Sequence, residues 1–108
     1  MSDLNPAEPQ AATASIADQE GVSVLRLSGE LDLATVADIQ RSVDAISGQA
    51  PEHLVVDLSG VTFMDSSGIA LLLQIAATRP RTELRNPTPL IRRVLEMTGL
   101  TETLPIVP

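Results

Sequence analysis

The chain has 108 residues, a net charge of −7, no cysteine, tryptophan or tyrosine, and a single phenylalanine, Phe63. This length fits one domain, and the absence of cysteine excludes disulfide bonds and thiolate metal sites. The acidic charge argues against nucleic acid as a partner, because binding to phosphates needs a basic face. No run of 18 apolar residues and no signal-peptide pattern is visible, so we expect a cytoplasmic protein with no membrane span.

The predicted elements begin after a tail. Residues 1–14 are rich in alanine, proline and small polar residues and show no period of 2 or 3.6. This composition predicts a disordered N-terminal tail, with the folded domain over residues 15–108. Residues 16–18 predict a short strand, and Gln19, Glu20 and Gly21 predict a hairpin turn. Residues 22–27 carry apolar side chains on both faces, which is typical of a covered strand.

A strand, a helix and a strand follow in the middle of the chain. Residues 29–32 predict a turn, and Thr35 and Asp38 have the spacing of a capping box for the helix after it. The apolar positions of that helix step by 3, 4 and 3, at Val36, Ile39, Val43 and Ile46. Residues 54–58 form a β-branched and leucine run, which predicts a buried strand. This order of elements predicts a parallel crossover connection.

The second predicted helix is unusually apolar. Eight of the nine residues from 69 to 77 are apolar, so the helix is either covered on nearly all sides or shows apolar surface to a partner. We expect its inner face to consist of Ile69, Leu72, Leu73 and Ala76.

The last predicted elements are a weak strand and a third helix. Residues 83–85 predict the strand. Thr88 predicts a helix cap with Pro89 at the first helical position, and Gly99 predicts the helix end. The expected inner stripe of this helix is Leu90, Ile91, Val94 and Leu95.

Polar residues lie where the buried strand passes into the second helix. This loop reads Asp65, Ser66, Ser67, Gly68, and in parallel α/β sheets ligands and partners usually bind at that edge. The three side-chain oxygens can accept hydrogen bonds from the free N–H groups of the first helical turn. Gly68 leaves the backbone bare for close approach by another molecule. The loop chemistry fits a simple helix cap and equally a serine exposed for modification.

Three stretches resemble one known family. Residues 63–69 (FMDSSGI) resemble the signature of the STAS domain, found in bacterial anti-sigma factor antagonists. Residues 27–32 (LSGELD) resemble its Gly-Glu-Leu-Asp segment, and residues 92–100 resemble its closing helix and turn. The resemblance implies an α/β fold: a STAS-like single domain, a mixed sheet of about four strands, with three to four helices packed mainly on one side.

The resemblance also implies a function based on partner switching. Unphosphorylated, the chain would bind an anti-sigma factor that is a serine kinase, and so release a sigma factor. In the family the serine after the aspartate is phosphorylated by this kinase, which carries over to Ser66, and a PP2C-type phosphatase would reset the switch. The implied partner-binding residues are Asp65, Ser66, Ser67, Gly68, Glu30 and Asp32.

Within this scheme each loop residue has an expected role. Asp65 would support Ser66, Ser67 would cap the helix, and Gly68 would let the partner close in. We expect no cofactor, because ATP would be bound by the partner kinase, and we expect a monomer.

Other functions are weighed against the sequence as follows: a serine enzyme, a metal site and a STAS subunit of a larger assembly. An enzyme with Ser66 or Ser67 as nucleophile needs a nearby base. The only histidine, His53, begins the buried strand, and about 5 residues at about 3.3 Å each separate it from the serine loop. Glu30 and Asp32 are two carboxylates alone, which suit a turn and a cap better than a metal site. We therefore predict no enzymatic activity. A STAS subunit that serves a transporter or a larger signalling assembly without phosphorylation remains an alternative.

Overall fold

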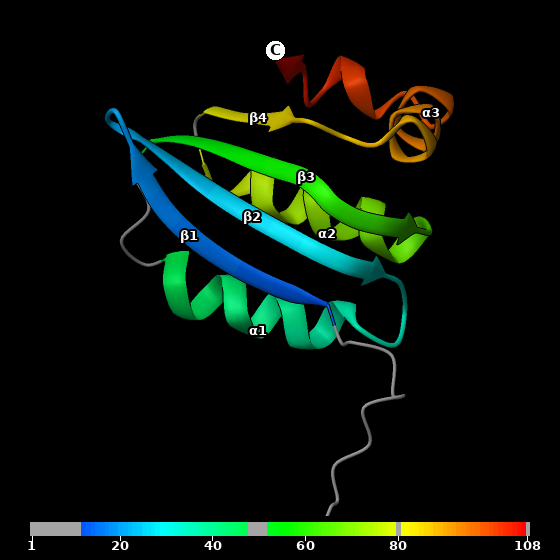
Figure 1. The fold of residues 1–108 in the computed structure, drawn as a ribbon, viewed down its shortest axis with the longest axis horizontal. Coiled ribbons are helices and arrows are strands. Elements are labelled where there is room, and N and C mark those ends of the chain that lie inside the picture. Colours follow the sequence, from blue (N-terminus) through cyan, green and yellow to red (C-terminus); the bar gives the residue numbers. More distant parts are fainter. Residues whose placement is uncertain (1–11, 48–51, 80, 108) are drawn as a thin grey trace, which may run out of the picture.

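The computed structural model describes residues 12–47, 52–79 and 81–107. These residues form a five-stranded mixed sheet in the order β1-β2-β3-β4-β5, with α1 and α2 on one face (Figure 1). The elements are β1 (Thr13–Gln19), β2 (Val22–Leu31), α1 (Val36–Ser47), β3 (His53–Met64), α2 (Ser66–Ala77), β4 (Arg81–Arg85), α3 (Pro89–Met97), the 3-10 helix η1 (Leu100–Glu102) and β5 (Ile106–Val107). The predicted fold class is confirmed, with one short strand more than expected.

The sheet opens with an antiparallel hairpin. β1 pairs with β2, and Glu20 and Gly21 connect them. The φ angles of these two residues, 54° and 84°, suit a two-residue hairpin turn. The strand begins at Thr13, earlier than the predicted strand over residues 16–18, and so includes two residues that the prediction assigned to the tail. Residues 1–11 of the predicted tail lie outside the described residues.

β2 is longer than its sequence suggests. It continues to Leu31 as the parallel partner of β3, and the pairing shifts register between Arg26 and Ser28 and again between Gly29 and Glu30. Such shifts mark β-bulges, which bend a strand without ending it. The predicted turn over residues 29–32 is therefore wrong for residues 29–31, which belong to β2. Pairing with β3 overrides the local turn preference of Ser-Gly-Glu.

The core lies between the sheet and the helices and contains no aromatic side chain. In α2 the buried positions are Gly68, Leu71, Leu72 and Ile75. The prediction placed Leu73 in the core, and this is wrong, since Leu73 is 40% exposed. In α3, Ile91 and Leu95 are buried but Leu90 is exposed, so the expected stripe is only partly correct. The Thr88 cap and the first-turn proline are confirmed, as Thr88 Oγ1 accepts from the Ile91 N–H at 3.3 Å.

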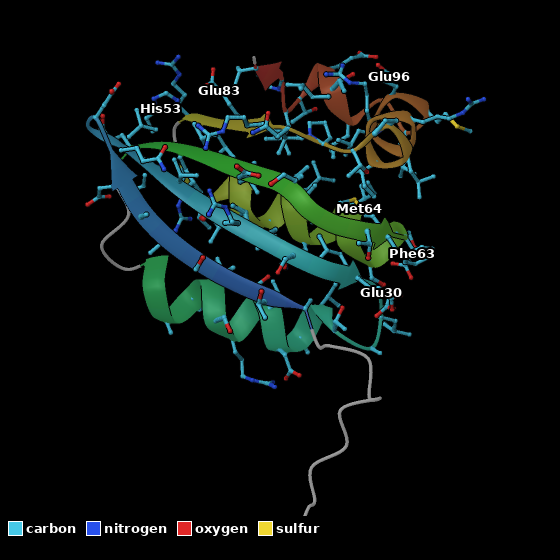
Figure 2. All side chains as sticks on the ribbon, viewed as in Figure 1. Glu30, His53, Phe63, Met64, Glu83 and Glu96 are labelled. Carbon is cyan, nitrogen blue, oxygen red and sulfur yellow. The ribbon has the colours of Figure 1, made fainter. Side chains whose placement is uncertain are left out.

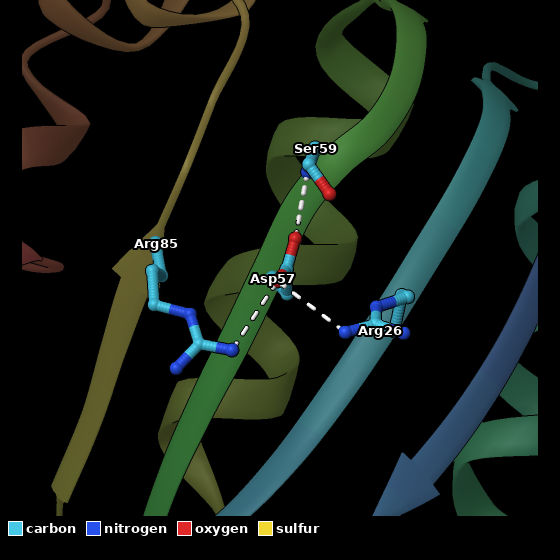
Figure 3. A network of polar contacts seen from close by, with 4 residues as sticks. All are labelled: Arg26, Asp57, Ser59 and Arg85. Carbon is cyan, nitrogen blue, oxygen red and sulfur yellow. Dashed lines mark hydrogen bonds and ion pairs between the residues drawn. The ribbon is translucent and has the colours of Figure 1, made fainter.

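A buried carboxylate joins three strands through the side chains shown in Figure 3. The Asp57 side chain is 4% exposed, with Oδ2 lying 3.3 Å from Arg85 Nη2 and 3.9 Å from Arg26 Nη2. Its Oδ1 accepts from the Ser59 N–H at 2.8 Å. Burial opposes ionisation, but the hydrogen bonds from Ser59 and Arg85 hold the pKa of Asp57 below its usual value. The ionised carboxylate therefore ties β2, β3 and β4 together.

His53 begins β3 as predicted, and it is half-buried and paired. Its Nε2 lies 2.6 Å from Glu83 Oε1, and both side chains are labelled in Figure 2. This hydrogen bond lowers the pKa of Glu83, with a smaller contribution from Arg81. His53 therefore serves to join β3 to β4.

Candidate functional site

The carboxyl ends of β2 and β3 meet at the amino end of α2. Glu30 pairs opposite Phe63, and Leu31 pairs opposite Met64, which brings two stretches some thirty residues apart in sequence side by side (Figure 2). The Asp65 N–H donates to the Leu31 carbonyl at 3.2 Å and fixes the loop against the end of β2. The structure thus gathers the predicted site residues at one edge of the sheet.

Asp65 is the cap of α2. Its backbone is extended, and its Oδ1 accepts from the N–H of Ser67 at 2.8 Å and from the N–H of Gly68 at 3.4 Å. The prediction that Ser67 caps the helix is therefore wrong. The helix begins two residues earlier, at Ser66, because a carboxylate at position 65 can satisfy two orphan N–H groups at once.

Ser66 is the first residue of α2 and is exposed. No hydrogen bond joins its hydroxyl to any residue that the structure describes, so the oxygen is not engaged in holding the loop. Ser67 is half-buried, and its backbone N–H donates to Asp65 Oδ1. Of the two serines, Ser66 has the more accessible hydroxyl.

Gly68 has a packing role that differs from the predicted one. It is buried, and a Cβ at this position would lie 2.6 Å from the Met64 side chain and 2.8 Å from the Leu31 carbonyl oxygen. The bare backbone therefore lets the first turn of α2 approach the ends of β2 and β3. It faces the interior and does not present a surface for a partner to approach.

The acidic segment after β2 is held by a turn. Asp32 Oδ1 accepts from the Ala34 N–H at 3.0 Å, and the Thr35 hydroxyl donates to the Glu30 carbonyl oxygen at 2.6 Å. Asp32 therefore has the expected turn role, whereas Asp38 pairs with Arg41 on the surface and makes no capping box with Thr35. The Glu30 residue itself is exposed beside Phe63.

Two apolar residues of the site were not singled out by the sequence. Leu33 is 80% exposed in the turn after β2, and Phe63 is 44% exposed at the end of β3. An apolar side chain inside a polar turn and the only aromatic residue of the chain were the available signals. We call Glu30, Leu33, Phe63 and Ser66 the switch surface. It combines apolar contact area with negative charge around one free hydroxyl.

The described residues hold no group of three or more histidine or acidic side chains that could bind a metal ion. His53 lies at the opposite end of β3 and is bonded to Glu83, so it cannot act as a base toward Ser66. No helix in the described part of the chain has the length and apolar character needed to cross a membrane.

Known proteins share this fold and sequence pattern. A family described as "Mlab, STAS domain" matches residues 14–108. The anti-sigma-F factor antagonist RsfB of Mycobacterium tuberculosis is 39% identical over 64 residues, which are 59% of this chain and only 52% of the relative, so the match spans about half of that protein. The anti-sigma F factor antagonist of Lysinibacillus sphaericus is 39% identical over 82 residues, 71% of this chain and 70% of the relative.

Solved structures agree with these sequence matches. The crystal structure of an anti-sigma factor antagonist from Mycobacterium paratuberculosis has a TM-score of 0.81 and 32% identity, covering 91% of this chain and 86% of that one. The anti-sigma factor antagonist SpoIIAA in its unphosphorylated form has a TM-score of 0.66 and 31% identity, covering 91% and 89%.

Proposed function

This chain belongs to the STAS domain family, and from that premise we propose that it is an anti-sigma factor antagonist that works by partner switching. Unphosphorylated, it binds an anti-sigma factor that is also a serine kinase, and a sigma factor is released. The kinase phosphorylates Ser66, the complex separates, and a PP2C-type phosphatase restores the hydroxyl. The chain acts as a binding protein without a cofactor, and ATP is bound by the kinase.

The single observation that carries this proposal is the state of the Ser66 hydroxyl. It is exposed, it has no hydrogen bond to the described residues, and it stands at the first position of α2. A phosphate at a helix amino end is tolerated, since the helix dipole and the free N–H groups favour an anion there. Ser66 can therefore carry a phosphate without disturbing the hydrogen bonds that Asp65 makes.

The switch surface explains why phosphate would end binding. Leu33 and Phe63 offer apolar area to a partner, and Glu30 and Asp65 place negative charge around it. The matching partner surface has an apolar pocket that receives these two apolar side chains. A phosphate on Ser66 adds roughly 1.5 to 2 negative charges. Closing an interface over the phosphate removes the water around its charges, beside the carboxylates of Glu30 and Asp65. This costs several kcal/mol if no cation pairs with the phosphate.

The test is phosphorylation by the partner kinase purified from the source cell. The wild-type chain is incubated with this kinase and ATP, and the modified peptide is located by mass spectrometry. We expect one phosphate on Ser66, none on Ser66→Ala, and full incorporation in Ser67→Ala, the matched control. Phosphate on Ser67 would move the acceptor by one residue. Stable binding to a partner with no phosphate on either serine would refute the switching function and favour a STAS subunit of a larger assembly.

A further inference from the structure

The side of α2 that points away from the sheet carries no charged side chain. Its exposed positions after Ser66 are Ala70, Leu73, Gln74 and Ala77. We call these four residues the α2 face. Ala70, Leu73 and Ala77 lie 4, 7 and 11 positions after Ser66, so they follow it in one line along the helix. The α2 face is therefore an apolar strip, broken only by Gln74, that begins at the exposed serine.

α1 shows how a solvated helix of this sheet is built. It lies on the same face of the sheet as α2 (Figure 1), and its exposed side includes Asp38, Arg41 and Asp44. A surface helix normally has charged or polar residues on the side away from the core, and α2 departs from this pattern. Of the two possibilities that the sequence left open, α2 is not covered on nearly all sides and instead shows apolar surface.

The area of the α2 face limits what can cover it. A helix of 12 residues is about 18 Å long and about 10 Å wide, so one side of it offers about 200 Å². One side of a stable protein interface buries about 800 Å². Two copies of this chain that met only through the α2 face would bury too little area, and each copy carries a net charge of −7. The α2 face therefore suits one part of a wider interface.

The wider interface is the one around Ser66. A partner that reaches the Ser66 hydroxyl must lie over the first turn of α2, because Ser66 is the first residue of that helix. A circular footprint of about 800 Å² has a radius of about 16 Å. At 1.5 Å per residue, Leu73 lies about 10 Å and Ala77 about 16 Å from Ser66 along the helix. A partner centred on Ser66 therefore covers Ala70 and Leu73 and reaches Ala77 at its rim.

We propose that the α2 face is a docking surface for the anti-sigma factor, beside the switch surface. This inference rests on the proposed function, because the same partner must cover Ser66. The partner presents uncharged, apolar surface to Ala70 and Leu73, since a charge there would lose its water with no opposite charge to pair with. Leu73 is the central contact, as the largest side chain of the α2 face and 40% exposed. It lies about one Debye length from Ser66, so its contacts supply affinity that a phosphate changes little.

The test is titration calorimetry of the full chain against the kinase that phosphorylates Ser66. Leu73→Gln and Ala70→Gln each place an amide in the apolar contact, and we expect each variant to bind at least about tenfold more weakly than wild type. Ala70 is exposed, so the melting temperature of Ala70→Gln should stay near wild type. Ala45→Gln is the matched control, because Ala45 is an exposed alanine of α1. It should bind the kinase as the wild type does.

Leu73→Gln should also lower the affinity of Ser66→Asp by the same factor as that of wild type, because sites this far apart contribute additively. Equal affinities of Ala70→Gln and Ala45→Gln would overturn the docking surface while phosphorylation of Ser66 still stands. A wild-type chain that binds no kinase refutes the proposed function itself, and this inference with it. A wild-type chain that sediments as a dimer, with Leu73→Gln as a monomer, would assign the α2 face to a second copy instead.

Discussion

Replacing Asp57 by asparagine keeps the shape of the side chain and removes its charge. The largest loss is the bond to Arg85, at 3.3 Å, because the Arg26 side chain is mostly exposed and its 3.9 Å contact is screened by water. In Asp57→Asn, the Ser59 N–H can still donate to the side-chain amide oxygen at position 57. One hydrogen bond to a charged group contributes about 1.5–3 kcal/mol, so we expect the free energy of unfolding at neutral pH to fall by that amount.

The pKa of Asp57 determines how the stability difference between wild type and Asp57→Asn changes with pH. The pKa of Asp57 is lower in the folded chain than its usual 3.8, so folding favours the ionised form. Its stabilising contribution is present above the unfolded pKa and is lost as pH falls through the folded pKa. The difference between wild type and Asp57→Asn should therefore shrink towards acid. Glu83, whose pKa is also lowered, titrates in both proteins and cancels in the difference.

The assay is urea unfolding at a series of pH values, with Asp38→Asn as the control for simple loss of charge. Asp38 is exposed and pairs with Arg41 on the surface, so its replacement should change the free energy of unfolding by less than about 0.5 kcal/mol. A gap between wild type and Asp57→Asn that stays constant from neutral to acidic pH would show that the carboxylate charge does not join the strands.

Three further predictions concern α2. Leu72→Ala should cost about 2–5 kcal/mol in urea unfolding, because it leaves a cavity in the core, whereas exposed Gln74→Ala should be nearly neutral; equal effects would contradict the burial of this face. Gly68→Ala should lower stability by about 1–3 kcal/mol, since its Cβ overlaps buried atoms, and an unchanged melting temperature would show that the helix shifts freely. Ser66→Asp should melt near wild type but bind the kinase at least about tenfold more weakly by titration calorimetry; equal affinity would refute the electrostatic account.

Local chemistry predicted the ends of α3 well. The cap at Thr88, the proline after it and the stop at Gly99, with its φ of 76°, depend on neighbours in the sequence. The extension of β2 to Leu31 and the short strand β5 depend on partners far along the chain, which residue patterns do not show. The same reason explains Leu73, whose exposure depends on which face of α2 packs against the sheet.

The sequence pointed to residues of the candidate site, but not to how these residues are arranged in space. The Asp-Ser-Ser-Gly order and the Gly-Glu-Leu-Asp segment located the edge of the sheet, but only the pairing of Glu30 with Phe63 shows that the two segments meet. The exposure of Leu33 follows from its place in the turn after β2.

The division of roles between adjacent residues makes Ser66 suitable as a switch. If its own hydroxyl capped α2, a phosphate would remove the cap, and modification would weaken the fold as well as the binding. Asp65 instead holds the N–H groups of Ser67 and Gly68, and its own N–H is held by Leu31. A phosphate on Ser66 therefore changes the charge and hydration of the switch surface while every hydrogen bond of the cap stays in place. Affinity for a partner can then change by orders of magnitude at nearly constant stability, which Ser66→Asp tests directly.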